Sequence, residues 1–97
     1  MRPTSAQQPT VTVELFGVPQ LLAQTRQVEL SAATLHELAQ QLATRLPALA
    51  GSVVDRATGW LLPGYIFVVD GRFTRDPNYQ LARGARVLLV AAQAGGM

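Results

Sequence analysis

The sequence predicts an α+β fold, in which one main helix packs on one face of a mixed sheet of four to five strands. Three stretches carry this prediction: an alternating run near the start, "TVTVELF", a capped helical pattern, "TLHELAQQLATRLP", and an apolar run near the end, "RVLLV". With 97 residues and no internal repeat, the chain has the length of one small domain.

The first of these stretches predicts the opening strand of a hairpin. Residues 10–16 alternate between apolar and polar side chains, which is typical of a half-buried strand with Phe16 on the solvent side. Its expected core-facing residues are Val11, Val13 and Leu15. "GVPQ" interrupts the strand, and "TRQVEL" resumes an extended pattern with Val28 and Leu30 inward, so we expect a hairpin with a longer loop.

The helix is the clearest element of the pattern. Thr34 followed three residues later by Glu37 has the form of a capping box, and Pro47 ends the helix. Its apolar positions follow helical spacing: Leu35, Leu38, Ala39, Leu42, Ala43 and Leu46. His36 lies beside this stripe and is expected to face solvent without a role.

The second half of the chain supplies the remaining strands. Residues 48–64 predict an extended connection with room for one short element, in which Trp60 with Leu61 and Leu62 covers one end of the core. "YIFVV" predicts a third strand, with Phe67 and Val69 inward and with Ile66 and Val68 outward. The pair "DG" predicts a tight turn into the short strand "RFT", and "RVLLV" predicts a central strand.

Pairing of the first and last strands in parallel, through a right-handed crossover, gives the β-grasp arrangement. We assign residues 10–91 to this domain. Residues 1–9 are polar with two prolines and are expected to form a disordered arm, and residues 92–97 a flexible Gly-Gly tail with one residue beyond.

The composition argues against an enzyme. The chain has no cysteine, one histidine and six scattered carboxylates, so it lacks the convergent groups that metal sites and acid-base pairs require. It has neither an apolar run of about 20 residues nor a signal peptide, which predicts a soluble, cytoplasmic protein without a membrane partner. All eight basic residues are arginine, so the chain has no lysine through which it could be linked to itself.

Nucleic acid is not an expected partner. The net charge is only +2, and the four arginines from position 72 to position 86 are close in sequence to Asp70 and Asp76 and have no aromatic ladder. Strand parity instead predicts a protein-docking face. If Val87 and Leu89 are core residues, Leu88 and Val90 emerge beside Phe16 on the free face of the sheet, and such apolar clusters mark partner sites.

The end of the chain resembles the ubiquitin-like sulfur carriers of the MoaD/ThiS family. That family typically shows a Leu, a Gly-containing turn, a Val-containing strand and a terminal Gly-Gly. Here the stretch is "LARGARVLLVAAQAGG", with Leu81, Gly84 and Val87 before Gly95 and Gly96. "VVDGRF" is similar to the family's turn, with Asp where Asn is common.

The resemblance implies that the Gly96 carboxylate is adenylated by an ATP-dependent activating enzyme, becomes a thiocarboxylate, and supplies sulfur to a synthase. The carrier itself would bind no cofactor or metal. Extended chain from Ala91 to Gly96 reaches roughly 20 Å, enough to thread an active site. Met97 departs from the family pattern, because it blocks the reactive carboxylate. We expect a JAMM-type metalloprotease to remove it; an added residue or a copy that is not activated are the alternatives.

A second departure is "ARGARV", where the family often has acidic residues. Arg83 and Arg86 therefore predict a dedicated activating enzyme with an acidic patch opposite them. Two other functions remain open: a ubiquitin-like modifier that is conjugated to other proteins through Gly96, and a β-grasp binding module whose tail is incidental.

Overall fold

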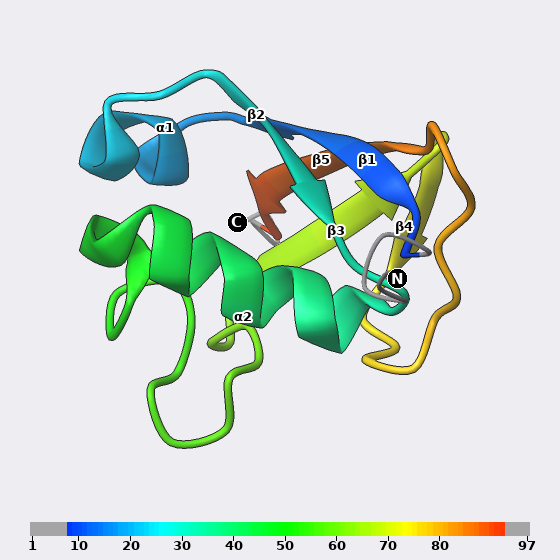
Figure 1. Cartoon of the computed structure of the whole chain (residues 1–97). Coiled ribbons are helices and arrows are strands. Elements are labelled where there is room, and N and C mark those ends of the chain that lie inside the picture. Colours follow the sequence, from blue (N-terminus) through cyan, green and yellow to red (C-terminus); the bar gives the residue numbers. More distant parts are fainter. Residues whose placement is uncertain (1–7, 93–97) are drawn as a thin grey trace, which may run out of the picture.

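A mixed five-stranded sheet forms one layer of the fold and α2 forms the other (Figure 1). The computed structural model describes residues 8–92. Within that range the strands are β1 (Thr10–Leu15), β2 (Gln27–Ser31), β3 (Tyr65–Val69), β4 (Arg72–Thr74) and β5 (Arg86–Ala91). The helices are α1 (Val18–Ala23), α2 (Leu35–Arg45) and the 3-10 turn η2 (Pro47–Leu49). The α+β, β-grasp prediction is confirmed.

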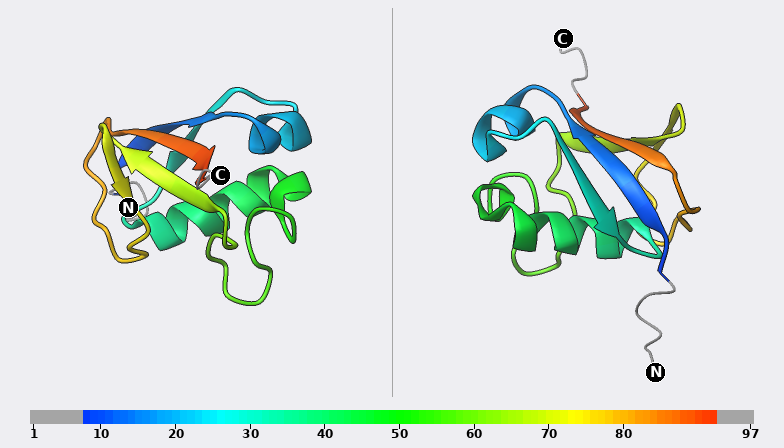
Figure 2. Two further views of the ribbon diagram at one scale, coloured as in Figure 1. Left: turned by 180° about the vertical axis from the view of Figure 1, so that it is seen from behind. Right: turned by 45° about the horizontal axis from the view of Figure 1, so that its top comes forward.

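The last strand, β5, lies at the centre of the sheet, whose strand order is β2-β1-β5-β3-β4. It pairs in parallel with β1 and antiparallel with β3, so that Leu89 lies opposite both Leu15 and Phe67. The expected parity is confirmed, because Val87 and Leu89 are fully buried whereas Leu88 and Val90 are half-buried on the other face. Both views of Figure 2 show α2 on one side of the sheet and α1 at the end where β1 stops.

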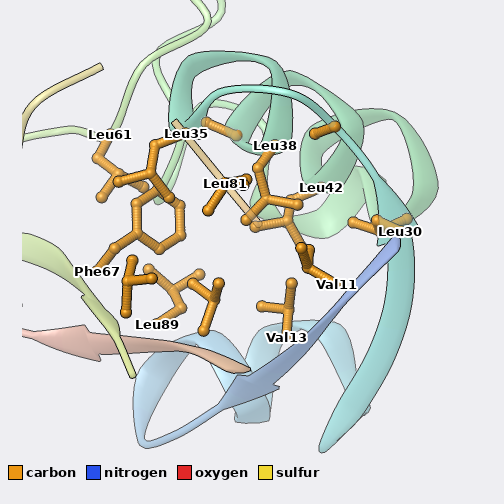
Figure 3. Close-up of a cluster of buried hydrophobic side chains, with 14 of the residues drawn as sticks. Val11, Val13, Leu30, Leu35, Leu38, Leu42, Leu61, Phe67, Leu81 and Leu89 are labelled. Carbon is orange, nitrogen blue, oxygen red and sulfur yellow. The ribbon is translucent and has the colours of Figure 1, made fainter. Parts of the chain in front are cut away.

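The core fills the space between the sheet and α2 (Figure 3). The largest fully buried side chains are Phe67, Leu15, Leu35, Leu38, Leu42, Leu49, Leu89, Val11, Val13, Val53, Val54 and Val87. No polar or charged residue of the described range is buried. The inward residues of β1, β3 and β5 are those that alternation predicted, which shows that side-chain parity decides the orientation of the sheet.

The start of α2 is held by two reciprocal side-chain contacts. Thr34 Oγ1 accepts a hydrogen bond from the Glu37 N–H at 3.2 Å, and Glu37 Oε1 accepts one from the N–H of Ala33 at 2.9 Å. The predicted capping box is therefore present, with its return bond made one residue before the cap.

The prediction that His36 faces solvent without a role is wrong. Its side chain is half-buried, and Nε2 lies 2.9 Å from the carbonyl oxygen of Thr58. The imidazole also meets the Trp60 ring edge-on, with centroids 6.2 Å apart, and Trp60 in turn packs on Phe67. His36 thus ties α2 to the long connection, and Trp60 closes one end of the core as predicted.

The hairpin between β1 and β2 also differs from the prediction, because its loop contains the helix α1. Pro19 in the first turn supplies a backbone angle suited to a helix start. Gln24 ends α1 in the left-handed region, with φ of 53°. The "DG" turn is confirmed: Asp70 and Gly71 both have positive φ, 48° and 88°, as a two-residue hairpin turn requires.

The structure covers only part of the predicted arm and tail. Residues 1–7 and 93–97, and with them Gly95, Gly96 and Met97, lie outside the described residues. Pro9, which the sequence placed in the arm, accepts a hydrogen bond from Ala32 at 3.0 Å, so pairing begins before β1. In the part of the chain that the structure describes, no helix is long and apolar enough to cross a membrane.

Candidate docking site at the carboxyl end of β5

Four apolar side chains gather on the free face of the sheet where β5 ends. Val90 lies opposite Ile66 of β3, and Leu88 precedes Val90 on the same face. Phe16 completes the group, because its N–H donates to the Leu89 carbonyl at 3.2 Å and so continues the β1–β5 pairing by one residue. We call Phe16, Ile66, Leu88 and Val90 the outer patch. Phe16 is exposed and the other three are half-buried.

The patch continues toward the sheet edge through Val68. Val68 faces outward as predicted, since it lies opposite Leu88 on one side and Phe73 on the other, but it is largely covered. Phe73 on the edge strand β4 is 69% exposed. The apolar outer face therefore spans β5, β3 and β4, and α2 covers only the opposite face.

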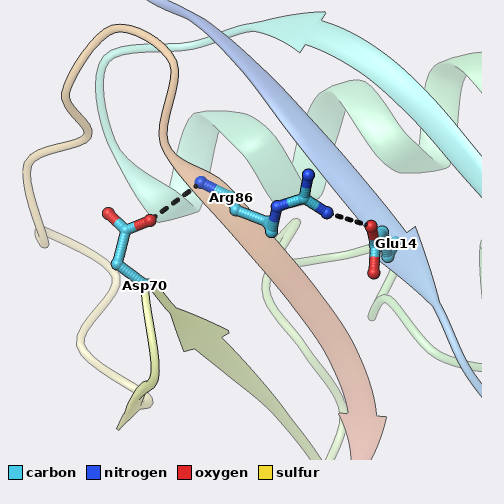
Figure 4. A network of polar contacts seen from close by, with 3 residues as sticks. All are labelled: Glu14, Asp70 and Arg86. Carbon is cyan, nitrogen blue, oxygen red and sulfur yellow. Dashed lines mark hydrogen bonds and ion pairs between the residues drawn. The ribbon is translucent and has the colours of Figure 1, made fainter.

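The other end of β5 is polar. The Arg86 guanidinium forms an ion pair with Glu14 on β1, and the Arg86 N–H donates to Asp70 Oδ1 at 3.1 Å (Figure 4). In return, the Asp70 N–H donates to the Arg86 carbonyl at 2.9 Å. Arg86 thus joins β5 to both β1 and the β3–β4 turn, and Glu14 partly neutralises the charge that the sequence assigned to docking. Arg83 is exposed in the preceding loop.

Sequence reasoning missed the contribution of Glu14. Glu14 and Arg86 are 72 positions apart, so no local motif links them. Two observations together could have identified this contact. Glu14 is one of the outward-facing residues of β1, and the parallel pairing of β1 with β5 puts it opposite Leu88, next to Arg86 on the same face.

The described residues contain no metal-binding group. Within residues 8–92, no cluster of three or more His, Asp or Glu side chains could hold an ion. An open depression of about 520 Å³ lies between α1 and the strands beside it, and its charged lining residues are Glu14 and Arg26. The site therefore combines an apolar surface with a few charged side chains, and these features are typical of protein-binding surfaces.

The two-layer topology, with β1 and β5 paired in parallel at the centre of the sheet and α2 across one face, defines a ubiquitin-like β-grasp fold. The chain belongs to the ThiS family, whose model matches residues 13–96. The match begins within β1 and extends through Gly96, and it confirms the resemblance that the terminal motif indicated.

Solved structures agree on the fold. SAMP1, small archaeal modifier protein 1, from Haloferax volcanii has a TM-score of 0.77 at 22% identity, covering 90% of this chain and 99% of that one. A putative molybdopterin converting factor subunit 1 from Pyrococcus furiosus has a TM-score of 0.69 at 19% identity, covering 86% and 97%. Urm1 from Trypanosoma brucei has a TM-score of 0.68 at 23% identity, covering 92% and 97%. No curated protein matches the chain.

Proposed function

We propose that this protein is a sulfur carrier whose Gly96 carboxylate, freed by removal of Met97, is adenylated and converted to a thiocarboxylate. The observation that carries the proposal is the extent of the family match, which ends at the second glycine of the Gly-Gly pair. The outer patch supports it, because a partner that takes the tail also meets Phe16 and Val90 at the point where the last strand ends.

The chemistry has two activation steps. A Gly96 carboxylate oxygen attacks the α-phosphorus of ATP and pyrophosphate leaves, which gives an acyl adenylate. Sulfide, brought by the sulfur source, then attacks the acyl carbon; the acyl–phosphate bond breaks, AMP leaves, and the thiocarboxylate is formed without any change of oxidation state. Glycine at the last two positions lets the phosphate approach a chain that has no Cβ. A synthase uses the sulfur for a small-molecule precursor, and hydrolysis restores the carboxylate.

In this proposal the carrier contributes only its tail and its docking surface, and the partner enzymes supply the catalytic groups and the co-substrates. ATP is bound by the activating enzyme, and the carrier binds no cofactor of its own. A JAMM-type peptidase that cleaves after Gly96 converts the proform into the substrate. The cytoplasm is the compartment that we expect, because it supplies ATP. Arg83 and the partly neutralised Arg86 favour an activating enzyme with an acidic surface at that end of the sheet.

A protein modifier is the second candidate, and one observation favours it: two of the similar structures are named SAMP1, a small archaeal modifier protein, and Urm1. Modification uses the same adenylation and the same tail, but the acyl group passes to an amine on another protein. A binding module that does not use the tail is the third candidate.

The test compares three forms of the chain: one ending at Gly96, the full chain with Met97, and the Gly96-terminated chain carrying Gly95→Val. Each is incubated with the activating enzyme of the same organism, ATP and a sulfur source, and pyrophosphate release and intact mass are followed. We expect the first form alone to release pyrophosphate and to exchange one oxygen for sulfur. Equal pyrophosphate release from all three forms would refute a role for the Gly96 carboxylate. If the chain is instead found attached through Gly96 to lysines of other proteins, the protein is a modifier.

A further inference from the structure

The helix α1 turns its large apolar side chains toward solvent. Val18, Leu21 and Leu22 have the spacing of one helical face, and their exposed fractions are 47%, 75% and 39%. On the other side of α1, Pro19 is buried and Ala23 packs against the core. A surface helix normally places its apolar face inward, so α1 has the reverse arrangement. We call Val18, Leu21 and Leu22 the α1 stripe.

Exposed apolar surface is concentrated at this place rather than scattered. Five large hydrophobic residues of the described chain are exposed, and four of them fall between positions 16 and 22. Phe16, 44% exposed, is separated from the helix only by its N-cap residue Gly17 and so lies in the chain between the outer patch and the α1 stripe. Scattered apolar residues need no explanation, whereas a contiguous group marks a surface that another molecule covers.

The position of α1 identifies which molecule that is. Cα atoms of α1 come within 8 Å of Cα atoms of β5, and Figure 1 shows the helix beside the end of that strand. Gly96 is four residues beyond Ala92, so even a fully extended chain carries it only about 14 Å away. The helix itself is about 9 Å long. An enzyme with Gly96 in its active site therefore stands close enough to contact the α1 stripe.

We propose that the α1 stripe is a second docking element, which enters an apolar pocket of the activating enzyme while that enzyme holds the tail. This proposal rests on the proposed function. The helix has no charged residue, since its sequence is "VPQLLA", so its recognition depends on burial of Leu21 and Val18. It is separate from the charged end of β5, where Arg86 and Glu14 lie.

The experiment measures KM and kcat for pyrophosphate release as the concentration of the Gly96-terminated carrier is varied. Leu21→Ser is expected to raise KM about tenfold with kcat unchanged, because the side chain contributes to binding and not to chemistry. Gln41→Ser is the control: Gln41 is exposed on α2, which lies on the face of the sheet opposite the outer patch, and the KM of this variant should stay within about twofold.

Thermal unfolding of both variants verifies that each is folded. Size-exclusion chromatography decides whether the α1 stripe instead joins two copies of the chain: a dimer that Leu21→Ser dissociates, with KM unchanged, would overturn the proposal. If wild type and Leu21→Ser are adenylated with the same KM, the α1 stripe is not a docking element, and the proposed function is unaffected. Failure of the wild-type Gly96-terminated chain to be adenylated would overturn the proposed function, and the docking element with it.

Discussion

The backbone N–H of Phe16 donates to the carbonyl of Leu89 at 3.2 Å, so the chain is bonded to the central strand, near its carboxyl end, two residues before α1 begins. This bond places the α1 stripe, the outer patch and the last described residue, Ala92, at one corner of the domain. A partner that approaches this corner meets apolar surface on both sides of the departing chain.

Charge placed in the outer patch should weaken activation. Val90→Asp puts a carboxylate beside Ile66 and Phe16, where an apolar partner surface would have to desolvate it, so we expect KM for the activating enzyme to rise at least about tenfold. Ser31→Asp, an equal change of charge on the edge strand β2 at the opposite end of the sheet, is the control. Similar kinetics for the two variants would argue against docking at the outer patch.

The Arg86–Glu14 pair allows stability and recognition to be separated. Arg86→Glu alone places two carboxylates together and is expected to lower the free energy of unfolding on the order of 1 kcal/mol. Adding Glu14→Arg should restore stability in urea denaturation, because the pair is re-formed with its charges exchanged. Activation should stay impaired in this double variant, since an acidic partner surface still meets Glu at position 86. Full recovery of the adenylation rate would exclude Arg86 from recognition.

Leucines on opposite sides of the fold should differ sharply in their effect on stability. Leu38→Ala removes a fully buried side chain beneath the sheet and is expected to lower the free energy of unfolding by about 3 kcal/mol. Leu21→Ala, in the α1 stripe, should change it by less than about 0.5 kcal/mol. Equal losses in denaturant titrations would mean that the Leu21 side chain itself packs against the domain and that the α1 stripe is not free.

His36 offers a test of the link between α2 and the long connection. His36→Ala removes the Nε2 contact with Thr58 and the edge contact with Trp60, which should lower the free energy of unfolding by about 1 kcal/mol. Gln41→Ala, at an exposed position of the same helix, is the control and should have almost no effect. If thermal melts did not distinguish the two variants, the contacts of His36 would contribute nothing to stability.

Most of the sheet and the main helix could be predicted from the sequence because both depend on periodicity. Alternation decided which residues of β1, β3 and β5 are buried, and the Thr34–Glu37 spacing located the start of α2. The helix α1 escaped prediction because a six-residue segment is too short for a helical period to emerge, and its apolar residues face solvent. His36 was misjudged because its partners, Thr58 and Trp60, lie in an irregular connection without a pattern.

The candidate site could be predicted only in part. Parity placed Leu88, Val90 and Phe16 on the free face, and the terminal motif indicated the reactive glycines. Glu14 becomes the partner of Arg86 only through the parallel pairing of β1 with β5, two strands at opposite ends of the sequence. Strand parity gives the face on which each residue lies, but it does not give the register between the two strands. The α1 stripe depends on the same tertiary arrangement, because only the fold brings α1 next to the end of β5.

The most direct test of the central claim is the intact mass of the protein purified from its own host, without thiol-reactive reagents, compared with the translated sequence. The sulfur-carrier account predicts a species that ends at Gly96, part of it with one carboxyl oxygen exchanged for sulfur. A single species that retains Met97, isolated while the receiving pathway is active, would contradict both the processing step and the carrier role.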